Sequence, residues 1–337
     1  MSYSIISSKK QELMGIAILW IFLFHSRFGQ DIFLLKDIVG FGSQGVDMFF
    51  FLSGLGLSYS LNRNSNIKKF YLRRFWRIAP TFFLFLIVVH IIGTWLGFPH
   101  PKTLLQCFCW YSTIGWWING LFSNPYCYFY EWYLPTLILF YVFAPVLKKC
   151  SIKILLAIMV VSTLLSLVFS YSGLLEHIYW SYQRIAVYVE GFLFYKLIKN
   201  HLITKSINYL LLTLFAGGAF LILSSSIFSD EQRVFTLAIY RFSMLLGMPV
   251  FLYILSSTLC KTPYLQSFLR ICGTLSLELY LLHIYSRPLS YVRGYILENN
   301  TLSIILTFFI LIILAYIINH FVEIITSRTQ MLFNYKC

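Results

Sequence analysis

Long apolar stretches recur along the whole chain and constrain its fold more than any other feature. A helix needs roughly 20 mostly apolar residues to cross the hydrocarbon core of a bilayer. Hydrophobic residues make up 59% of the chain and charged residues only 11%, more apolar surface than a soluble fold of this size can bury. The sequence therefore predicts an all-α integral membrane protein, with residues 1–337 forming a single domain.

The spacing of the apolar stretches predicts about ten transmembrane helices. We place them near 13–28, 44–61, 78–97, 131–147, 154–172, 182–198, 207–227, 237–258, 271–288 and 301–323. With the N-terminus inside, most Lys and Arg residues fall in the inner segments, which is the positive-inside pattern. We therefore expect both termini on the inner side. The first stretch lacks a small-residue cleavage site, which favours a retained helix over a cleaved signal.

The formal charge of +14 does not indicate a nucleic-acid partner, because the basic residues are concentrated beside predicted helices. Segment 62–77 is the strongest example, and the bilayer surface is the expected partner for charges in such a position. The seven cysteines lack paired metal-ligand spacing. We expect most of them to be apolar packing residues and predict no metal site.

Ionisable residues inside the predicted spans are candidates for function, because they are costly there unless they face a cavity or a partner. These residues are His25, Asp47, His90, Glu190, Arg241, Glu278, His283 and Arg287. His25 lies about 16 Å beyond Met14 along a helix, in the outer half of the membrane. Asp47, His283 and Arg287 reach a similar depth, so we expect these four groups to converge. A carboxylate beside a histidine can fix its tautomer and raise its basicity, as a general base requires.

Other roles compete with catalysis at several of these positions. His25 alone could be a structural hydrogen-bond donor between helices. Asp47 could cap the second helix, since Asp favours helix starts. We favour structural roles for His90 and Glu190, and the role of Arg241 stays open.

Two segments outside the spans also have two interpretations each. Arg73, Arg74 and Arg77 precede a helix, where anionic lipid headgroups explain them well. Arginines beside a helix N-terminus also form a phosphate site. The aromatic segment 98–130 is typical of an interfacial belt, and it could instead be a platform for stacking sugars.

Five short motifs occur in one order along the chain. They are 14–18 (MGIAI) followed by His25, 45–54 (GVDMFFFLSG), 71–80 (YLRRFWRIAP), 132–135 (WYLP) and 276–283 (SLELYLLH). Together they resemble the acyltransferase 3 family of bacterial membrane acyltransferases, whose signatures include G-V-D-x-F-F-x-x-S-G and R-R-x-x-R-I-x-P. The resemblance extends from residue 11 to about 320, and it is closest to surface-polysaccharide O-acetyltransferases without a fused extracytoplasmic domain.

The resemblance implies an O-acyltransferase of the bacterial inner membrane. It would move an acyl group, expected to be acetyl, from cytoplasmic acetyl-CoA or another acyl-CoA to a hydroxyl of a surface polysaccharide or its lipid-linked precursor. The acyl-CoA is then a co-substrate, and no tightly bound cofactor is expected. An acyl-histidine intermediate is an alternative to direct transfer.

Roles for individual residues follow from the same resemblance. His25 would be the general base and Asp47 would orient its ring. The donor phosphates would lie on Arg73, Arg74 and Arg77. Further site candidates are Ser53, Glu278 and His283, with Ser53 or His283 donating to the developing oxyanion.

One position departs from the family pattern. The family usually has Arg or Lys eleven residues before the histidine, where this chain has Met14. Lys10, one helical turn earlier, or segment 62–77 could take that role, or the donor could be held differently. A non-enzymatic transporter or flippase of a lipid-linked glycan is the competing function, and a non-carbohydrate acceptor is a third possibility.

Overall fold

The computed structural model describes residues 3–26, 28–29, 32, 35–96, 100–122, 132–172, 178–223, 246–283 and 301–332. Within these ranges all regular secondary structure is helical, so the all-α prediction is confirmed. The labelled helices are α1 (Ser4–Ser8), α2 (Lys10–Ser26), α3 (Leu35–Gly40), α4 (Gln44–Arg63), α5 (Ile67–Leu96), α6 (Leu104–Tyr111), α7 (Ile114–Phe122), α8 (Tyr133–Lys149), α9 (Ile152–Ser172), α10 (Tyr179–Tyr182), α11 (Ile185–Lys199), α12 (Lys205–Leu223), η4 (Leu259–Lys261), α14 (Pro263–Thr274) and α16 (Thr301–Leu332). Two further helical segments are Leu246–Ser257 and 276–283.

Three of the described helices are long and apolar enough to cross a membrane. These spans are Ile67–Trp95, Ile152–Phe169 and Leu302–Ser327, within α5, α9 and α16. Only 17% of the span in α9 is buried inside the protein, so most of its apolar surface is free to face lipid. Other predicted spans form shorter helices, such as α11 with 15 residues. The apolar helices are those expected of a membrane protein.

Two helix boundaries differ from the sequence prediction. The basic segment 62–77, predicted to connect two spans, is largely helical, because α5 begins at Ile67 and continues past Pro80. Lys and Arg are good helix formers, so their charge does not end the helix. The predicted span 271–288 is preceded by α14, which begins at Pro263, and a turn at Leu275 separates α14 from 276–283.

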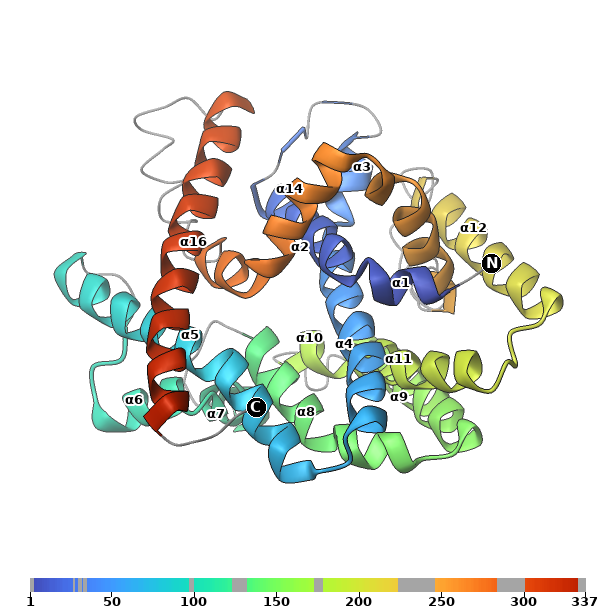
Figure 1. Ribbon diagram of the computed structural model, residues 1–337, viewed down its shortest axis with the longest axis horizontal. Helices are drawn as coiled ribbons and strands as arrows, with labels where there is room; N and C mark the ends of the chain where they lie inside the picture. Colours follow the sequence, from blue (N-terminus) through green and yellow to red (C-terminus); the bar gives the residue numbers. More distant parts are fainter. Residues whose placement is uncertain are drawn as a thin grey trace.

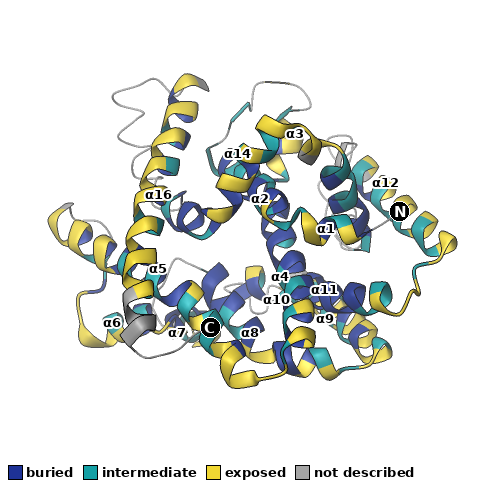
Figure 2. Cartoon of the chain, in the orientation of Figure 1, coloured by how far each residue is buried: buried dark blue, intermediate teal, exposed yellow. Residues whose placement is uncertain are grey.

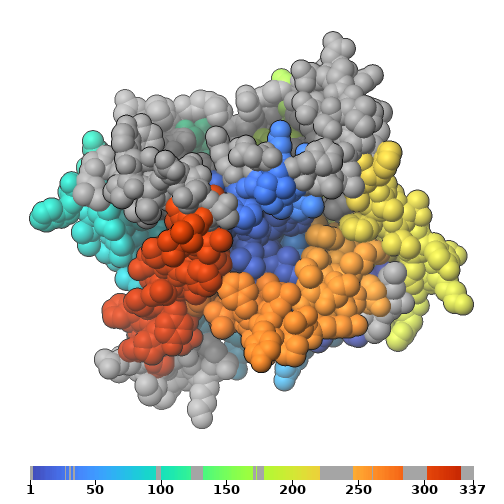
Figure 3. Space-filling model, turned by 90° about the horizontal axis from the view of Figure 1, so that it is seen from above, coloured from blue at the N-terminus to red at the C-terminus, as the bar shows by residue number. Residues whose placement is uncertain are grey.

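The centre of the molecule is a packed group of helices. α4 lies between α2, α8 and α11, and α14 packs along α2 (Figure 1). Figure 2 shows α4 and α11 as largely buried, whereas α16 and much of α5 are exposed. The largest fully buried side chains include Phe50, Phe51, Tyr188 and Phe192, all from α4 and α11. Viewed from above, α16 and α12 lie at opposite edges, with the N-terminal helices between them (Figure 3).

Glycines allow two pairs of these helices to touch through their backbones. A side chain at Gly54 of α4 would overlap the carbonyl of Tyr188 in α11, and one at Gly191 would collide with α4. In the same way, Gly15 of α2 lies against the carbonyl of Leu269 in α14. Small residues of this kind bring helices together in membrane proteins, where apolar side chains gain little by leaving lipid.

The aromatic segment 98–130 is partly helical. It contains α6 and α7, and α6 begins with a capping box between Thr103 and Gln106. Residues 123–131 of this segment lie outside the described ranges. Cys109 in α6 is disulfide-bonded, which differs from the packing role predicted for most cysteines. Cys107, Cys150 and Cys272 are free.

Candidate functional site

A basic pocket lies where the five sequence motifs meet. α2 contributes Lys10 and Met14, α4 contributes Ser53, and α5 contributes Arg74 and Arg77. The other lining residues include Phe49, Tyr133, Tyr141, Ser276 and Tyr280. Each of the five motifs therefore supplies at least one lining residue, although they span most of the chain. We call this cavity the donor pocket, because the family resemblance implies that the acyl donor would lie on Arg74 and Arg77.

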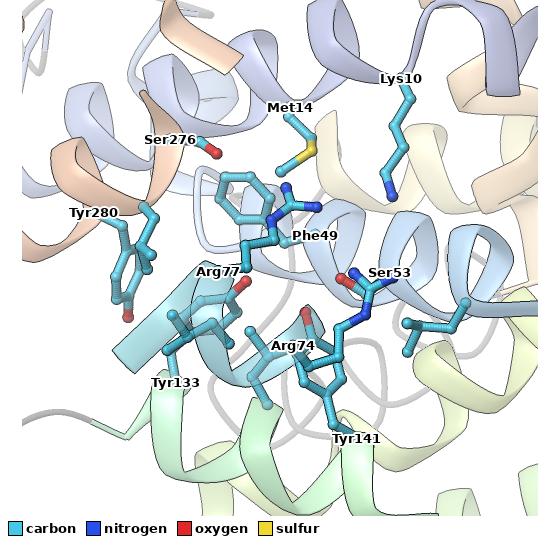
Figure 4. Close-up of a pocket in the computed structure, with 14 residues that line it drawn as sticks. Lys10, Met14, Phe49, Ser53, Arg74, Arg77, Tyr133, Tyr141, Ser276 and Tyr280 are labelled. Atoms are coloured by element: carbon cyan, nitrogen blue, oxygen red, sulfur yellow. The ribbon is translucent and has the colours of Figure 1, made fainter. Parts of the chain in front are cut away.

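Among the described residues, the lining of the donor pocket has three cationic side chains and no carboxylate. Figure 4 shows the guanidinium of Arg77 pointing toward Met14, the guanidinium of Arg74 pointing toward Ser53, and Lys10 entering from α2. Like charges so close together repel one another. An anion between them would relieve that repulsion, so the pocket favours a negatively charged ligand.

The surrounding structure holds these cations in place. The guanidinium of Arg74 lies over the rings of Phe70 and Tyr141, 5.6 and 5.7 Å from their centroids, where cation–π attraction orients it. The Nε atom of Arg74 is buried and has no hydrogen-bond partner among the described residues, leaving a donor for a ligand. A side chain at Gly56 would overlap the ammonium group of Lys10, so this glycine makes room for the lysine.

Not every basic residue of the motif reaches the pocket. Arg74 and Arg77 line it, whereas Arg73 on the same helix does not. Lys10 lines it beside Met14, which is consistent with the alternative that Lys10 supplies the missing charge of the first helix. The free volume is about 50 Å³, far below the roughly 300–1,000 Å³ of typical small-molecule pockets. A large ligand would have to displace side chains to enter.

A row of aromatic rings leads from the donor pocket to His25. Tyr133 and Tyr280 line the pocket, and their ring centroids are 4.6 Å apart. Tyr280 contacts His283 at 4.9 Å, and His283 contacts His25 at 4.9 Å. His283 is buried and His25 is half-buried. The two histidines predicted at a similar depth thus lie side by side, whereas Arg287 and Arg241 lie outside the described residues.

The local contact of His25 indicates its tautomer. Nδ1 lies 3.0 Å from the carbonyl oxygen of Ile21, one turn earlier in α2. A carbonyl only accepts hydrogen bonds, so Nδ1 carries the proton in this contact and the lone pair of the neutral ring is on Nε2. Sequence analysis did not identify this partner. It leaves Nε2 as the nitrogen able to accept a proton.

Asp47 has a cationic partner that sequence analysis missed. Its Oδ1 lies 3.0 Å from Nε of Arg184, just before α11. The N-cap position of α4 belongs to Ser43, so Asp47 lies within the first turn and is not the capping residue. Glu190 is buried on α11, close enough to Asp47 for their charges to interact. Asp47 therefore has a cation, Arg184, on one side and a second carboxyl group, Glu190, nearby.

Aromatic and hydroxyl groups surround Arg184. Its guanidinium lies 5.4 Å from the ring centroid of Trp132 and 5.6 Å from that of Trp180. Nearby, the hydroxyl of Ser181 accepts a hydrogen bond from Nε1 of Trp116 at 2.9 Å and lies 2.7 Å from the hydroxyl of Thr136. Arg184 lies near the start of the predicted span 182–198, four residues after Trp180. An arginine and a tryptophan in these positions could have indicated the cluster from the sequence.

Glu278 is held by hydrogen bonds from two other helices. Thr81 of α5 donates to its Oε1 at 3.2 Å, and Asn319 of α16 donates to the same oxygen at 3.4 Å. The carboxyl group lies close enough to Arg77 for their charges to interact, but it does not line the donor pocket. In this structure Glu278 connects α5, 276–283 and α16.

Metal ligation has no support in the described residues, where no group of three or more His, Cys, Asp or Glu side chains could hold an ion. The ionisable groups instead form three arrangements: three cations at the donor pocket, the His25–His283 pair, and the Asp47–Arg184 pair. The first can bind an anion. The second offers imidazole nitrogens that can accept or donate hydrogen bonds, and the third offers charge and aromatic faces to a polar ligand.

Comparison with known proteins agrees with the motifs that meet at the donor pocket. A search of curated proteins found no match to the chain, and a search of solved structures found none either. The sequence profile of the acyltransferase 3 family, described as an acyltransferase domain, matches residues 13–320, nearly the whole chain. The protein therefore belongs to the acyltransferase 3 family.

Proposed function

We propose that this protein is a multi-pass O-acyltransferase of the bacterial inner membrane. It transfers an acyl group, expected to be acetyl, from a cytoplasmic acyl-CoA to a hydroxyl of a surface polysaccharide or its lipid-linked precursor. The observation that carries the proposal is the convergence of five distant motifs on one pocket with Lys10, Arg74 and Arg77 and no carboxylate.

The donor pocket suits the phosphates of coenzyme A. Arginine forks bind phosphate oxygens through paired hydrogen bonds, and lysine adds a point charge. Arg74 and Arg77 are the proposed phosphate ligands, with Lys10 in the place of the basic residue that the family usually has at position 14. Arg73, which does not line the pocket, is left to contact lipid headgroups or the outermost part of the nucleotide.

The proposed chemistry takes place at the histidine pair. Nε2 of His25 removes the proton of the acceptor hydroxyl as its oxygen attacks the thioester carbonyl. The tetrahedral intermediate carries an oxyanion, to which Ser53 or the N–H group of a neutral His283 donates a hydrogen bond. Its collapse breaks the C–S bond, and the imidazolium of His25 returns the proton to the leaving thiolate. The products are the O-acyl ester and free coenzyme A.

The cluster around Arg184 suits a carbohydrate acceptor. Trp132 and Trp180 flank its guanidinium, so flat apolar faces lie next to a charged pair. Sugars present apolar C–H faces and several hydroxyls, which match such a surface. The pairing with Arg184 also holds Asp47, the proposed orienting carboxylate for His25, in a fixed position.

The proposed topology has about ten spans with both termini inside. The disulfide at Cys109 supports it, because disulfides persist on the oxidising outer side of a membrane and are rare in the cytoplasm. In this arrangement the donor pocket opens from the inner side and segment 98–130 lies outside, near the acceptor.

The test measures binding and turnover of radiolabelled acetyl-CoA by the full chain in lipid nanodiscs. We expect the wild type and His25→Ala to bind the donor equally, with acyl transfer only by the wild type. His90→Ala is the matched control, because His90 is also an intramembrane histidine but its ring contacts His100 and not the His25–His283 pair. It should retain turnover.

Each outcome has a clear meaning for the proposal. Full acyl transfer by His25→Ala would overturn its role as the base. No donor binding by folded wild-type protein would overturn acyl-CoA as the donor and favour a transporter of a lipid-linked glycan.

A further inference from the structure

A second cavity, of about 560 Å³, lies at the ends of α4, α8 and α11 and the start of α9. Four lysines line it: Lys148, Lys153, Lys196 and Lys199. We call it the lysine pocket. It shares no lining residue with the donor pocket, because α4 turns Leu57 toward the donor pocket and Ser58 toward the lysine pocket. The helix ends that form it are those predicted on the inner side.

The charges of the lysine pocket are not neutralised by the protein. No Asp or Glu lines it, and none of the ion pairs in the described part of the chain involves its four lysines. Four like charges around one cavity repel one another, and the repulsion is screened less in a recess than on an open surface. The cavity therefore favours an anion.

Two of the four lysines donate hydrogen bonds to residues at the end of α4, and the other two keep their N–H groups for a ligand. Lys148 donates to the carbonyl of Leu61 at 2.6 Å, and Lys199 donates to the side chain of Asn62 at 3.2 Å. These bonds attach the end of α4 to α8 and α11. Lys153 and Lys196 make no hydrogen bond with the described residues, so all three N–H groups of each ammonium remain for a ligand.

The first turn of α9 adds to the anion preference. Ser151 lines the cavity just before this helix, and its hydroxyl accepts a hydrogen bond from the amide of Ile154 at 3.3 Å. The remaining amides of the first turn, together with the helix dipole, attract negative charge. Lysines and a helix N-terminus thus act on the same cavity.

The surface next to the cavity indicates where the anion comes from. α9 begins at the lysine pocket, and its apolar side chains Ile154, Leu156, Val160 and Leu164 are exposed. A phospholipid could lay its acyl chains along α9 with its headgroup in the cavity. We propose that the lysine pocket binds the phosphate-bearing headgroup of an anionic phospholipid of the inner leaflet.

The experiment titrates delipidated full-length protein in detergent with phosphatidylglycerol, with zwitterionic phosphatidylcholine, and with inorganic phosphate. The test variant Lys153→Gln/Lys196→Gln removes the two available ammonium groups. Its matched control, Lys36→Gln/Lys102→Gln, removes two exposed charges that lie outside the cavity and outside segment 62–77. A charge-preserving variant, Lys153→Arg/Lys196→Arg, separates loss of charge from damage to the fold.

We expect phosphatidylglycerol to bind more tightly than either other probe. The test variant should lose about tenfold in affinity, because each lysine near an anionic headgroup contributes appreciably to binding. The Lys36/Lys102 control should stay within about twofold of the wild type, and the arginine variant should retain binding.

Three results would overturn the proposal. The first is equal affinity of the wild type and the test variant for phosphatidylglycerol. The second is inorganic phosphate binding as tightly as the lipid, which would make the site one for soluble anions. The third is an equal loss of coenzyme A affinity in the test variant, which would make the cavity part of the donor site. The proposal does not depend on the acyltransferase mechanism.

Discussion

The donor pocket and the cluster around Arg184 both contain arginine, but their charges are arranged in opposite ways. The donor pocket gathers Lys10, Arg74 and Arg77 without a carboxylate in its lining, whereas Arg184 is paired with Asp47 and covered by two tryptophans. The positive charges that line the donor pocket would be neutralised by a bound anion, whereas the charge of Arg184 is already neutralised by Asp47. The difference teaches that one end of the proposed site selects by charge and the other by shape and hydrogen bonding.

The largest expected effect comes from removing the arginines of the donor pocket. Arg74→Ala/Arg77→Ala should weaken coenzyme A binding about a hundredfold or more, because each charged hydrogen bond contributes about 1.5–3 kcal/mol. Equilibrium binding of labelled coenzyme A measures this. Arg73→Ala is the control on the same helix and should change the affinity only a few-fold. Equal losses in the two variants would break the distinction between pocket and surface arginines.

Disrupting the balanced pair should affect the acceptor and leave the donor unchanged. Arg184→Gln removes the partner of Asp47 and the charge between the two tryptophans. We expect kcat/KM for the acceptor to fall about tenfold, which corresponds to about 1.4 kcal/mol of transition-state stabilisation. Coenzyme A affinity should stay the same. A matching loss of donor affinity would show that the two regions are one electrostatic unit.

The role of Lys10 can be tested by moving its positive charge one helical turn along α2. Lys10→Met should reduce coenzyme A affinity about fivefold to tenfold, since one charged contact is lost. Lys10→Met/Met14→Lys restores a lysine one turn later, at the position usual for the family. Recovery to within about threefold of the wild type is expected, because both positions line the donor pocket. Failure to recover would mean that the position of the charge matters as much as its presence.

The smallest expected effect is that of ionic strength, which should weaken binding at the donor pocket and leave the cluster around Arg184 almost unaffected. The apparent coenzyme A affinity should fall a few-fold between low and about 0.5 M ionic strength, because free ions screen the interaction between phosphates and cations. The KM for a neutral acceptor should change little over the same range. A KM that followed the donor affinity would contradict the idea of a balanced acceptor region.

The sequence predicted the helical class and the segments that meet, but not how far each helix extends. The motifs at 45–54 and 71–80 carry hydrophobic and basic patterns that are readable without a structure. The start of α5 at Ile67 was missed because basic residues next to a span were taken as its boundary, although their helix propensity is high. α6 could have been found from its Thr103-x-x-Gln106 capping signal.

Pairings between distant residues were the part that sequence could not supply. Arg184 and Asp47 are far apart in the chain, and no local pattern links them. Glu278 was noted as a charge inside the membrane, but its partners Thr81 and Asn319 become visible only when three helices are placed together. The tautomer of His25 likewise depends on a backbone carbonyl that every helix offers.

The glycine contacts have a consequence for how the protein moves. Backbones that touch at Gly54 and Gly191 cannot slide or rotate past each other without collision, so α4 and α11 form one moving block. Contacts at Gly15 and Gly273 make α2 and α14 a second block. A side chain at Gly45 of α4 would likewise overlap the carbonyl of Ala17 in α2, so the two blocks are also joined to each other. A thioester larger than the present cavity must therefore gain its space from an outward swing of α5 or α8.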